Sequence, residues 1–287
     1  MNWTSRREKF RAILDGDRCI HPASVYDPLS VRIADELGFE LGMFAGSTAS
    51  LTVLGAPDVV VLTLSEFAGQ ALRISRAAAL PFMVDADHGY GNALNARRTV
   101  EELEMAGVAG LTIEDTLLPA PFGAHDKMQL VSVKEGVGKM RAALSGRQDE
   151  RLAIIGRTSA MGVTGTADAV TRIKAYEAAG VDAIFLANVT KREQVEAAAA
   201  AVKLPLILGN VQPDLADRDW LAAQRVRVCL QGHQPIMAAV QAIHDTMLAL
   251  KNGTPPNQIK GTASPDYMKR ITRDALHQSW TREFLSG

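Results

Sequence analysis

The stretch Glu104-Met-Ala-Gly107-Val-Ala-Gly-Leu-Thr-Ile113 contains the end of a helix, a glycine and an apolar strand within a few residues. The same order recurs in residues 35–44 and in residues 177–186, with a glycine at the corresponding place each time. Glycine can take the left-handed conformation in which many helices end. The recurrence therefore predicts a repeated unit of a helix followed by a strand.

Further apolar runs raise the expected number of strands to eight; they are Ile20–Val25, Pro81–Asp87, Leu152–Thr158, Leu204–Leu208 and Val226–Leu230. Helix starts are indicated by Thr63 with Glu66 and by Thr190 with Glu193, which have the spacing of a capping box. Eight such units in 287 residues predict an α/β protein with a (β/α)8 barrel of the TIM type. We expect a single barrel domain over residues 1–287, with the barrel at about 18–250 and a C-terminal helical extension at about 251–287.

Composition points to a small-molecule partner. The formal net charge is -1 and charged residues make up 22% of the chain, so neither nucleic acid nor a membrane surface is an expected partner. The first ten residues are charged and lack the apolar core of a secretory signal, which favours a cytoplasmic location. Cys19 and Cys229 lie in apolar, strand-like surroundings and are expected to be buried, inert thiols.

Candidate site residues follow the expected strands, where barrels of this type carry their active sites. The run that starts at Pro81 ends in Asp85 and Asp87, whose alternation directs both carboxylates to one side. The remaining candidates at strand ends are Asp27, Ser47, Glu114, Asp115, Arg157 and His233.

Carboxylates from neighbouring strands, without a cluster of histidines or cysteines, predict a Mg2+ site. We expect Asp85 to bind the ion directly and Asp87 and Glu114 to bind it through water, with Mn2+ as a possible substitute. Arg157 offers a planar guanidinium for a substrate carboxylate. Structural alternatives remain open: the aspartates could cap a helix, Glu114 with Asp115 could be a solvated pair, and Arg157 could belong to a structural ion pair.

Several motifs resemble the phosphoenolpyruvate mutase/isocitrate lyase superfamily, and within it the oxaloacetate decarboxylase family. They are Tyr26-Asp-Pro-Leu-Ser30, Ala45-Gly-Ser47, Pro57-Asp58, Asp85-Ala-Asp87-His-Gly-Tyr-Gly91, Ile113-Glu-Asp115 and Gly156-Arg157-Thr158. Tyr26, Asp27, Asp58 and His88 thereby become secondary site candidates. The resemblance covers residues 10 to 250, and its motifs are specific to the superfamily rather than to one reaction.

The segment after the fourth strand narrows the expected reaction. In isocitrate and 2-methylisocitrate lyases the corresponding segment resembles Lys-Lys-Cys-Gly-His, whereas residues 116–129 of this chain contain no cysteine. Leu-Leu-Pro-Ala at 117–120 and Gly232-His233 are similar to the decarboxylases. The chain departs from the family pattern at Ser159, Met161–Gly165 and Gln234-Pro235. Leu117–Leu130 is either a gating loop or a fixed surface loop.

The resemblance implies Mg2+-dependent decarboxylation of oxaloacetate, a small 2-oxoacid, to pyruvate and CO2 through a metal-stabilised enolate. It assigns Mg2+ to Asp85, metal-bound waters to Asp87 and Glu114, and substrate contacts to Ser47, Arg157 and His233. It also implies a homotetramer, a dimer of dimers, with the last helix exchanged between subunits. Two alternatives stay open: a carbon–carbon lyase acting on a substituted malate or related acid, and a non-catalytic carboxylate-binding barrel.

Overall fold

The computed structural model describes residues 3–123 and 127–285 and divides into two compact units, Met1–Gly232 and His233–Gly287. Within the described part of the first unit, eight parallel strands form one sheet in sequence order. They are β1 (Ala23–Ser24), β2 (Gly42–Phe44), β3 (Phe82–Asp85), β4 (Gly110–Glu114), β5 (Ala153–Thr158), β6 (Ala183–Leu186), β7 (Leu206–Leu208) and β8 (Val226–Cys229). The interpretation of the whole chain as one domain stays a prediction.

The sheet closes on itself next to β1. The Ile20 amide donates to the carbonyl of Arg227 at 2.9 Å, and the Cys229 amide donates to the carbonyl of Ile20 at 3.0 Å. This confirms the predicted (β/α)8 barrel. The first strand is shorter than the predicted Ile20–Val25, because Pro22 has no amide hydrogen to donate to a neighbouring strand.

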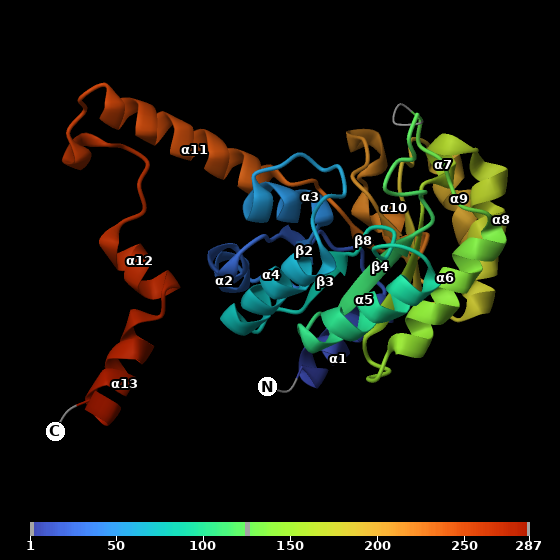
Figure 1. The fold of residues 1–287 in the computed structure, drawn as a ribbon, viewed down its shortest axis with the longest axis horizontal. Coiled ribbons are helices and arrows are strands. Elements are labelled where there is room, and N and C mark those ends of the chain that lie inside the picture. Colours follow the sequence, from blue (N-terminus) through green and yellow to red (C-terminus); the bar gives the residue numbers. More distant parts are fainter. Residues whose placement is uncertain (1–2, 124–126, 286–287) are drawn as a thin grey trace. The chain divides into compact units, whose positions relative to one another are not determined.

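Helices cover the outside of this barrel, and α5, α6 and α8 lie side by side there (Figure 1). The helices of the first unit are α1 (Thr4–Leu14), α2 (Pro28–Glu36), α3 (Gly46–Ala49), α4 (Leu64–Ala77), α5 (Ala93–Met105), α6 (Val133–Gly146), α7 (Ala160–Val163), α8 (Thr166–Ala179), α9 (Arg192–Ala201) and α10 (Arg218–Ala223). Most residues of Met161–Gly165, the segment that departs from the family pattern, thus belong to α7.

One of the two predicted capping boxes is present. Thr63 accepts a hydrogen bond from the Glu66 amide, and the Glu66 carboxylate accepts one from the Thr63 amide at 2.9 Å. The box predicted from Thr190 and Glu193 is wrong. The side-chain oxygen of Gln194 accepts from the amides of Thr190 and Lys191 instead, and α9 begins at Arg192.

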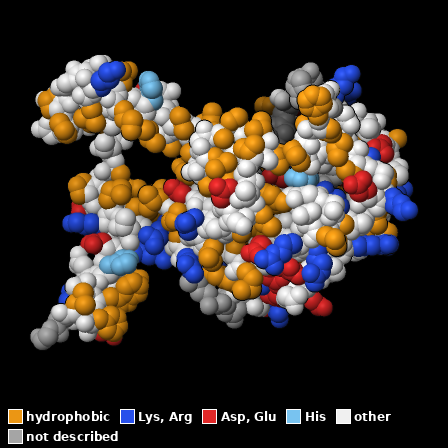
Figure 2. Space-filling view, in the orientation of Figure 1, with side chains coloured by type: hydrophobic (Ala, Val, Ile, Leu, Met, Phe, Trp, Pro, Cys, Tyr) orange, Lys and Arg blue, Asp and Glu red, His pale blue; other side chains and the backbone are white. Residues whose placement is uncertain are grey.

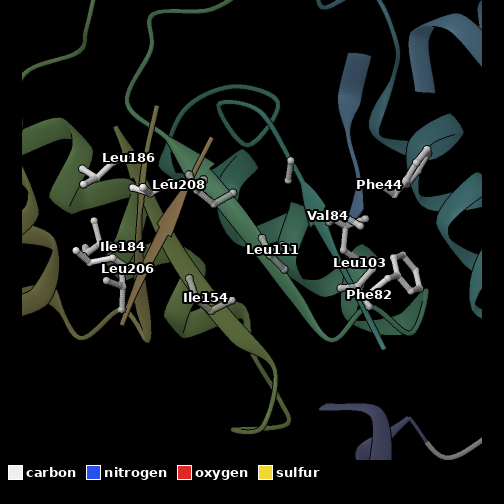
Figure 3. Packing of buried hydrophobic residues seen from close by; sticks show 14 of the residues in the cluster. Phe44, Phe82, Val84, Leu103, Leu111, Ile154, Ile184, Leu186, Leu206 and Leu208 are labelled. Atoms are coloured by element: carbon white, nitrogen blue, oxygen red, sulfur yellow. The ribbon is translucent and has the colours of Figure 1, made fainter. Parts of the chain in front are cut away.

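Apolar residues pack on both sides of the strands. The outer layer lies between strands and helices, where Leu103 of α5 joins Phe82 and Val84 of β3 in one buried cluster (Figure 3). The inner layer includes Phe10 of α1, which precedes the barrel. A Cβ atom on Gly110 would lie 2.5 Å from the Phe10 ring, so the close approach of α1 to β4 requires glycine at this position.

The C-terminal unit consists of α11 (Gln234–Lys251), α12 (Pro265–Ile271) and α13 (Asp274–Leu285). Hydrophobic side chains are prominent along it (Figure 2). Large apolar residues that are at least 40% exposed include Met237, Val240, Ile243, Met247, Trp280 and Phe284. None of the helices within 3–123 and 127–285 is long and apolar enough to cross a bilayer.

Candidate metal and substrate site

The site is built around the turn that follows β3. Asp87 and Tyr90 both have a positive φ, at 47° and 58°, and the turn between them contains Gly89. The Gly89 carbonyl accepts a hydrogen bond from the Thr99 hydroxyl of α5 at 3.1 Å. A Cβ atom on Gly89 would lie 3.0 Å from Ala96, so this turn packs directly against α5. The position of Asp87 is therefore fixed by backbone geometry.

Asp85 is held from two sides. Its Oδ1 accepts hydrogen bonds from the Thr112 hydroxyl at 2.8 Å and from the Asp87 amide at 3.3 Å. Its Oδ2 accepts from Nη1 of Arg157. Thr112 is the register partner of Asp85 across β3 and β4, so strand pairing places this hydroxyl.

Arg157 connects two carboxylates. Besides the ion pair with Asp85, its Nε lies 3.2 Å from Oε2 of Glu114, its register partner on β4. The guanidinium also lies over the Phe185 ring, 5.2 Å from the centroid. The ion pair that the sequence left open for Arg157 is thus present, and its substrate contact stays a prediction.

Acidic groups outnumber cations in this site. Burial raises the pKa of Asp87 well above its ordinary value, and the nearby charges of Asp85, Glu114 and Asp58 raise it further. Burial also raises the pKa of Glu114, although Arg157 opposes this. Asp85 and Glu114 pair with the same guanidinium and Asp87 has no ion pair among the described residues, so an added positive charge would stabilise the ionised forms of these carboxylates.

These residues fit a hard divalent cation. The available groups are carboxylate oxygens, which Mg2+ prefers to nitrogen or sulfur ligands. In the described ranges, no group of three or more His, Cys, Asp or Glu side chains is arranged to hold a metal ion by itself. Mg2+ often takes only one or two protein carboxylates and keeps several waters.

The start of α3 lies beside this acidic group. A Cβ atom on Gly46 would lie 2.7 Å from Oδ2 of Asp87, so only glycine allows the carboxylate to approach this closely. Ser47 is the next residue and is half-buried. The fold thus brings the segment that carries Ser47 to Asp87. His233 begins the C-terminal unit, immediately before α11, and its substrate contact stays a prediction.

The secondary candidates have different surroundings. Asp27 caps α2 by accepting from the Ser30 amide at 2.7 Å, which gives it a structural role. Burial raises the pKa of the neighbouring Tyr26. Asp58 is exposed, while His88 is buried and its pKa is lowered to about 4 by burial and by Lys139.

Sequence reasoning missed the roles of Thr112 and Tyr90. The Tyr90 hydroxyl is buried without a hydrogen-bond partner in the described residues. Burial raises its pKa, and the charges of Asp87, Asp85 and Asp58 raise it further. The motif Asp85–Gly91 contains Tyr90 and could have indicated it as a site residue. The contact of Thr112 with Asp85 could be found only from the pairing of β3 with β4. The Leu117–Leu130 loop includes residues 124–126, which lie outside the described residues, so its gating role stays a prediction.

Comparisons with known proteins show the family and the fold of this chain. The family model described as phosphoenolpyruvate phosphomutase matches residues 10–251. An oxaloacetate decarboxylase of Bradyrhizobium diazoefficiens is 60% identical over 275 residues, which are 96% of this chain and 95% of that protein. Phosphonopyruvate hydrolase in complex with oxalate and Mg2+ has a TM-score of 0.85 at 26% identity, covering 98% and 99% of the two chains. A 2,3-dimethylmalate lyase has a TM-score of 0.81 at 28% identity, covering 99% and 98%.

Proposed function

Because this chain belongs to the phosphoenolpyruvate phosphomutase family, we propose that it decarboxylates oxaloacetate to pyruvate and CO2. The acidic group at the ends of β3 and β4, with Arg157 at its centre, carries the proposal. The 60% identity to an oxaloacetate decarboxylase supports this reaction among those of the family.

Asp85, Asp87 and Glu114 would hold Mg2+, with Asp85 as the direct ligand and the other two acting through water. Mn2+ could replace it, because both ions accept oxygen ligands. When bound, Mg2+ supplies Lewis-acid chemistry for a ketone oxygen of the substrate. The hydrogen bond from Thr112 keeps the Asp85 carboxylate oriented for this task.

Arg157, Ser47 and His233 would bind and orient the substrate. Arg157 is suited to a carboxylate because its guanidinium donates two parallel hydrogen bonds. In the substrate, the bond between the departing carboxylate carbon and its neighbour breaks, CO2 leaves, and the electron pair moves toward the ketone oxygen. The resulting enolate takes up a proton to give pyruvate. No protein nucleophile is needed for this sequence.

The test is pyruvate formation from oxaloacetate by the purified protein, with Mg2+, with a chelator and with Asp85→Ala. A blank with the same metal concentration corrects for spontaneous loss of CO2. Saturable turnover that chelator and substitution both abolish is expected. Turnover equal to the blank would contradict the proposal.

A second candidate is a carbon–carbon lyase that acts on a substituted malate, favoured by the similarity to 2,3-dimethylmalate lyase. Such an enzyme would release two carbon products and no CO2. The absence of cysteine from residues 116–129 disfavours this lyase reaction, since isocitrate and 2-methylisocitrate lyases have a cysteine in the corresponding segment. Turnover of no 2-oxoacid or substituted malate would leave a non-catalytic carboxylate-binding barrel.

The assembly that we propose is a homotetramer in which the C-terminal helix is exchanged between subunits. The exposed apolar side chains of α11 and α13 support this, because contiguous exposed apolar surface marks interaction sites. Light scattering of the intact protein tests it, and a monomer would contradict it. A cytoplasmic location is also proposed, with support from the two free cysteines.

A further inference from the structure

Glu114 and Asp115 are consecutive residues at the end of β4, and they have different partners. Glu114 contacts Arg157 in the site, with 3.2 Å between Oε2 and Nε. Asp115 is completely buried and contacts α8 instead. Successive side chains of a strand point to opposite faces, which explains why these two residues have different partners. Because the two residues are adjacent in the chain, contacts that hold Asp115 in place also hold the backbone of Glu114.

Two side chains of α8 bind the same oxygen of Asp115. The Tyr176 hydroxyl donates to Oδ2 at 2.7 Å, and Nη1 of Arg172 donates to it at 3.1 Å. Arg172 also donates to the Val131 carbonyl at 2.9 Å, and the Val131 amide donates to the Asp115 carbonyl at 2.9 Å. Arg172 therefore joins the end of β4 to the residues just before α6.

Tyr176 touches the neighbours of both members of the Glu114–Arg157 pair. Its hydroxyl binds Asp115, which follows Glu114. Its ring packs against Gly156, which precedes Arg157, so that a Cβ atom on Gly156 would lie 3.3 Å from the Cβ and ring atoms of Tyr176. One fully buried side chain thus supports the two strand ends from outside the barrel.

Gly136 leaves space for the Tyr176 hydroxyl. A Cβ atom on Gly136 of α6 would lie 2.5 Å from the Tyr176 hydroxyl oxygen, a distance that real Cβ atoms do not show. Gly138 lies on the same helix, and a Cβ atom there would meet nothing within 4 Å. Glycine lowers helix stability relative to alanine, so helix propensity does not account for Gly136.

We propose that Tyr176 is a positioning residue that sets the separation of Glu114 and Arg157, and through it the affinity of the metal site. The inference rests on the proposed function, because it assumes that Glu114 contributes to a divalent cation site. Tyr176 itself does not touch metal or substrate in this assignment. It acts through Asp115 on one strand and through Gly156 on the other.

The experiment compares Mn2+ binding by the wild-type protein with binding by Tyr176→Phe, Gly136→Ala and Gly138→Ala. Free Mn2+ is measured by electron paramagnetic resonance without substrate, so the readout does not depend on turnover. Tyr176→Phe removes the hydroxyl and keeps the ring. Gly136→Ala keeps the hydroxyl but adds a methyl group on α6 that displaces it. Gly138→Ala is the matched control on the same helix.

Tyr176→Phe and Gly136→Ala are each expected to raise the Mn2+ dissociation constant about three- to tenfold, somewhat less than the loss of a group that contacts a metal ligand directly. Gly138→Ala is expected to bind as the wild type does. Unchanged Mn2+ binding by Tyr176→Phe would overturn the inference alone. A wild-type protein without Mn2+ binding would contradict the metal site of the proposed function and the inference with it.

A structural defect is separated from a positioning effect by stability measurements on the same variants. Gly136→Ala and Tyr176→Phe should unfold cooperatively in urea. At urea concentrations where both variants and the wild type are fully folded, the variants should still bind Mn2+ more weakly than the wild type does. A loss of Mn2+ binding that merely follows the unfolded fraction would overturn the inference.

Discussion

Arg157 on β5 forms an ion pair with Asp85 on β3, reaching past the intervening strand β4. On the way its Nε lies 3.2 Å from Glu114, so one guanidinium serves carboxylates from two different strands. Asp87 adds a third carboxylate, whose pKa burial and its acidic neighbours raise. The consequence is an acidic site in which an added cation would stabilise the ionised carboxylates.

Asp85→Ala should abolish metal-dependent turnover while the barrel stays folded. The substitution removes the proposed direct ligand, and losing a principal electrostatic stabiliser lowers turnover by a factor on the order of 10^3. Pyruvate formation, measured beside a blank with the same metal, checks the activity, and circular dichroism checks the fold. Normal turnover by a folded Asp85→Ala protein would remove the metal assignment.

Arg157→Lys should destabilise the protein and weaken substrate binding. An ammonium group cannot contact Asp85 and Glu114 with the geometry of a planar guanidinium. Because the Arg157 side chain is only 19% exposed, we expect a loss of about 1–3 kcal/mol in the free energy of unfolding. Urea unfolding measures this loss, and added Mg2+ should restore part of it by neutralising the carboxylates.

The matched control for this substitution is Arg97→Lys on α5. Arg97 pairs with Glu101 one helical turn away at 2.6 Å, and its side chain is 45% exposed. Exposed pairs of this kind contribute at most about 0.5 kcal/mol. Equal destabilisation by the two substitutions would mean that Arg157 has no special role in balancing the buried acids.

The fold was predictable because it repeats. Helix, glycine and apolar strand recur along the chain, and eight such units have few ways to bury their apolar faces other than as a barrel. The helix α1 was not predicted, because it precedes the first unit and its burial depends on Gly110, which is distant in sequence. The start of α9 was misplaced by competition between two possible capping side chains, Glu193 and Gln194.

The site was predictable where it depends on strand ends and not where it depends on register. Asp85, Glu114 and Arg157 come together because each stands at the end of a neighbouring strand. Thr112 could not be assigned, since its contact with Asp85 follows from the pairing of β3 with β4. The support of Asp115 by Tyr176 likewise spans residues that no local pattern connects.

The two cysteines should be unreactive in the folded protein. Burial raises the pKa of Cys19 to about 11 and that of Cys229 to about 12. The thiolate is the reactive form, so a disulfide reagent at pH 8 should modify both thiols slowly in buffer and quickly in urea. Rapid modification of the native protein would show that these thiols are accessible.

The same shifts make stability fall at high pH. An unfolded chain begins to lose thiol protons near pH 9, whereas the folded chain keeps them up to the raised values of Cys19 and Cys229. This contribution to stability is complete below pH 9 and decreases as pH rises above it, by about 1 kcal/mol per thiol at pH 10. Urea unfolding at pH 8 and pH 10 should show a smaller decrease in a Cys19→Ala, Cys229→Ala variant. Equal decreases would contradict the prediction.

His233→Gln should impair substrate use more than metal binding. His233 is predicted to orient the substrate, whereas the acidic side chains assigned to Mg2+ all belong to the first unit. We therefore expect the KM for oxaloacetate to rise about tenfold, the typical cost of losing one hydrogen bond to a charged group. The Mn2+ dissociation constant without substrate should stay within about twofold of the wild-type value, since no proposed ligand changes. Steady-state kinetics and Mn2+ titration separate the two effects, and a parallel loss of both would place His233 in the metal site instead.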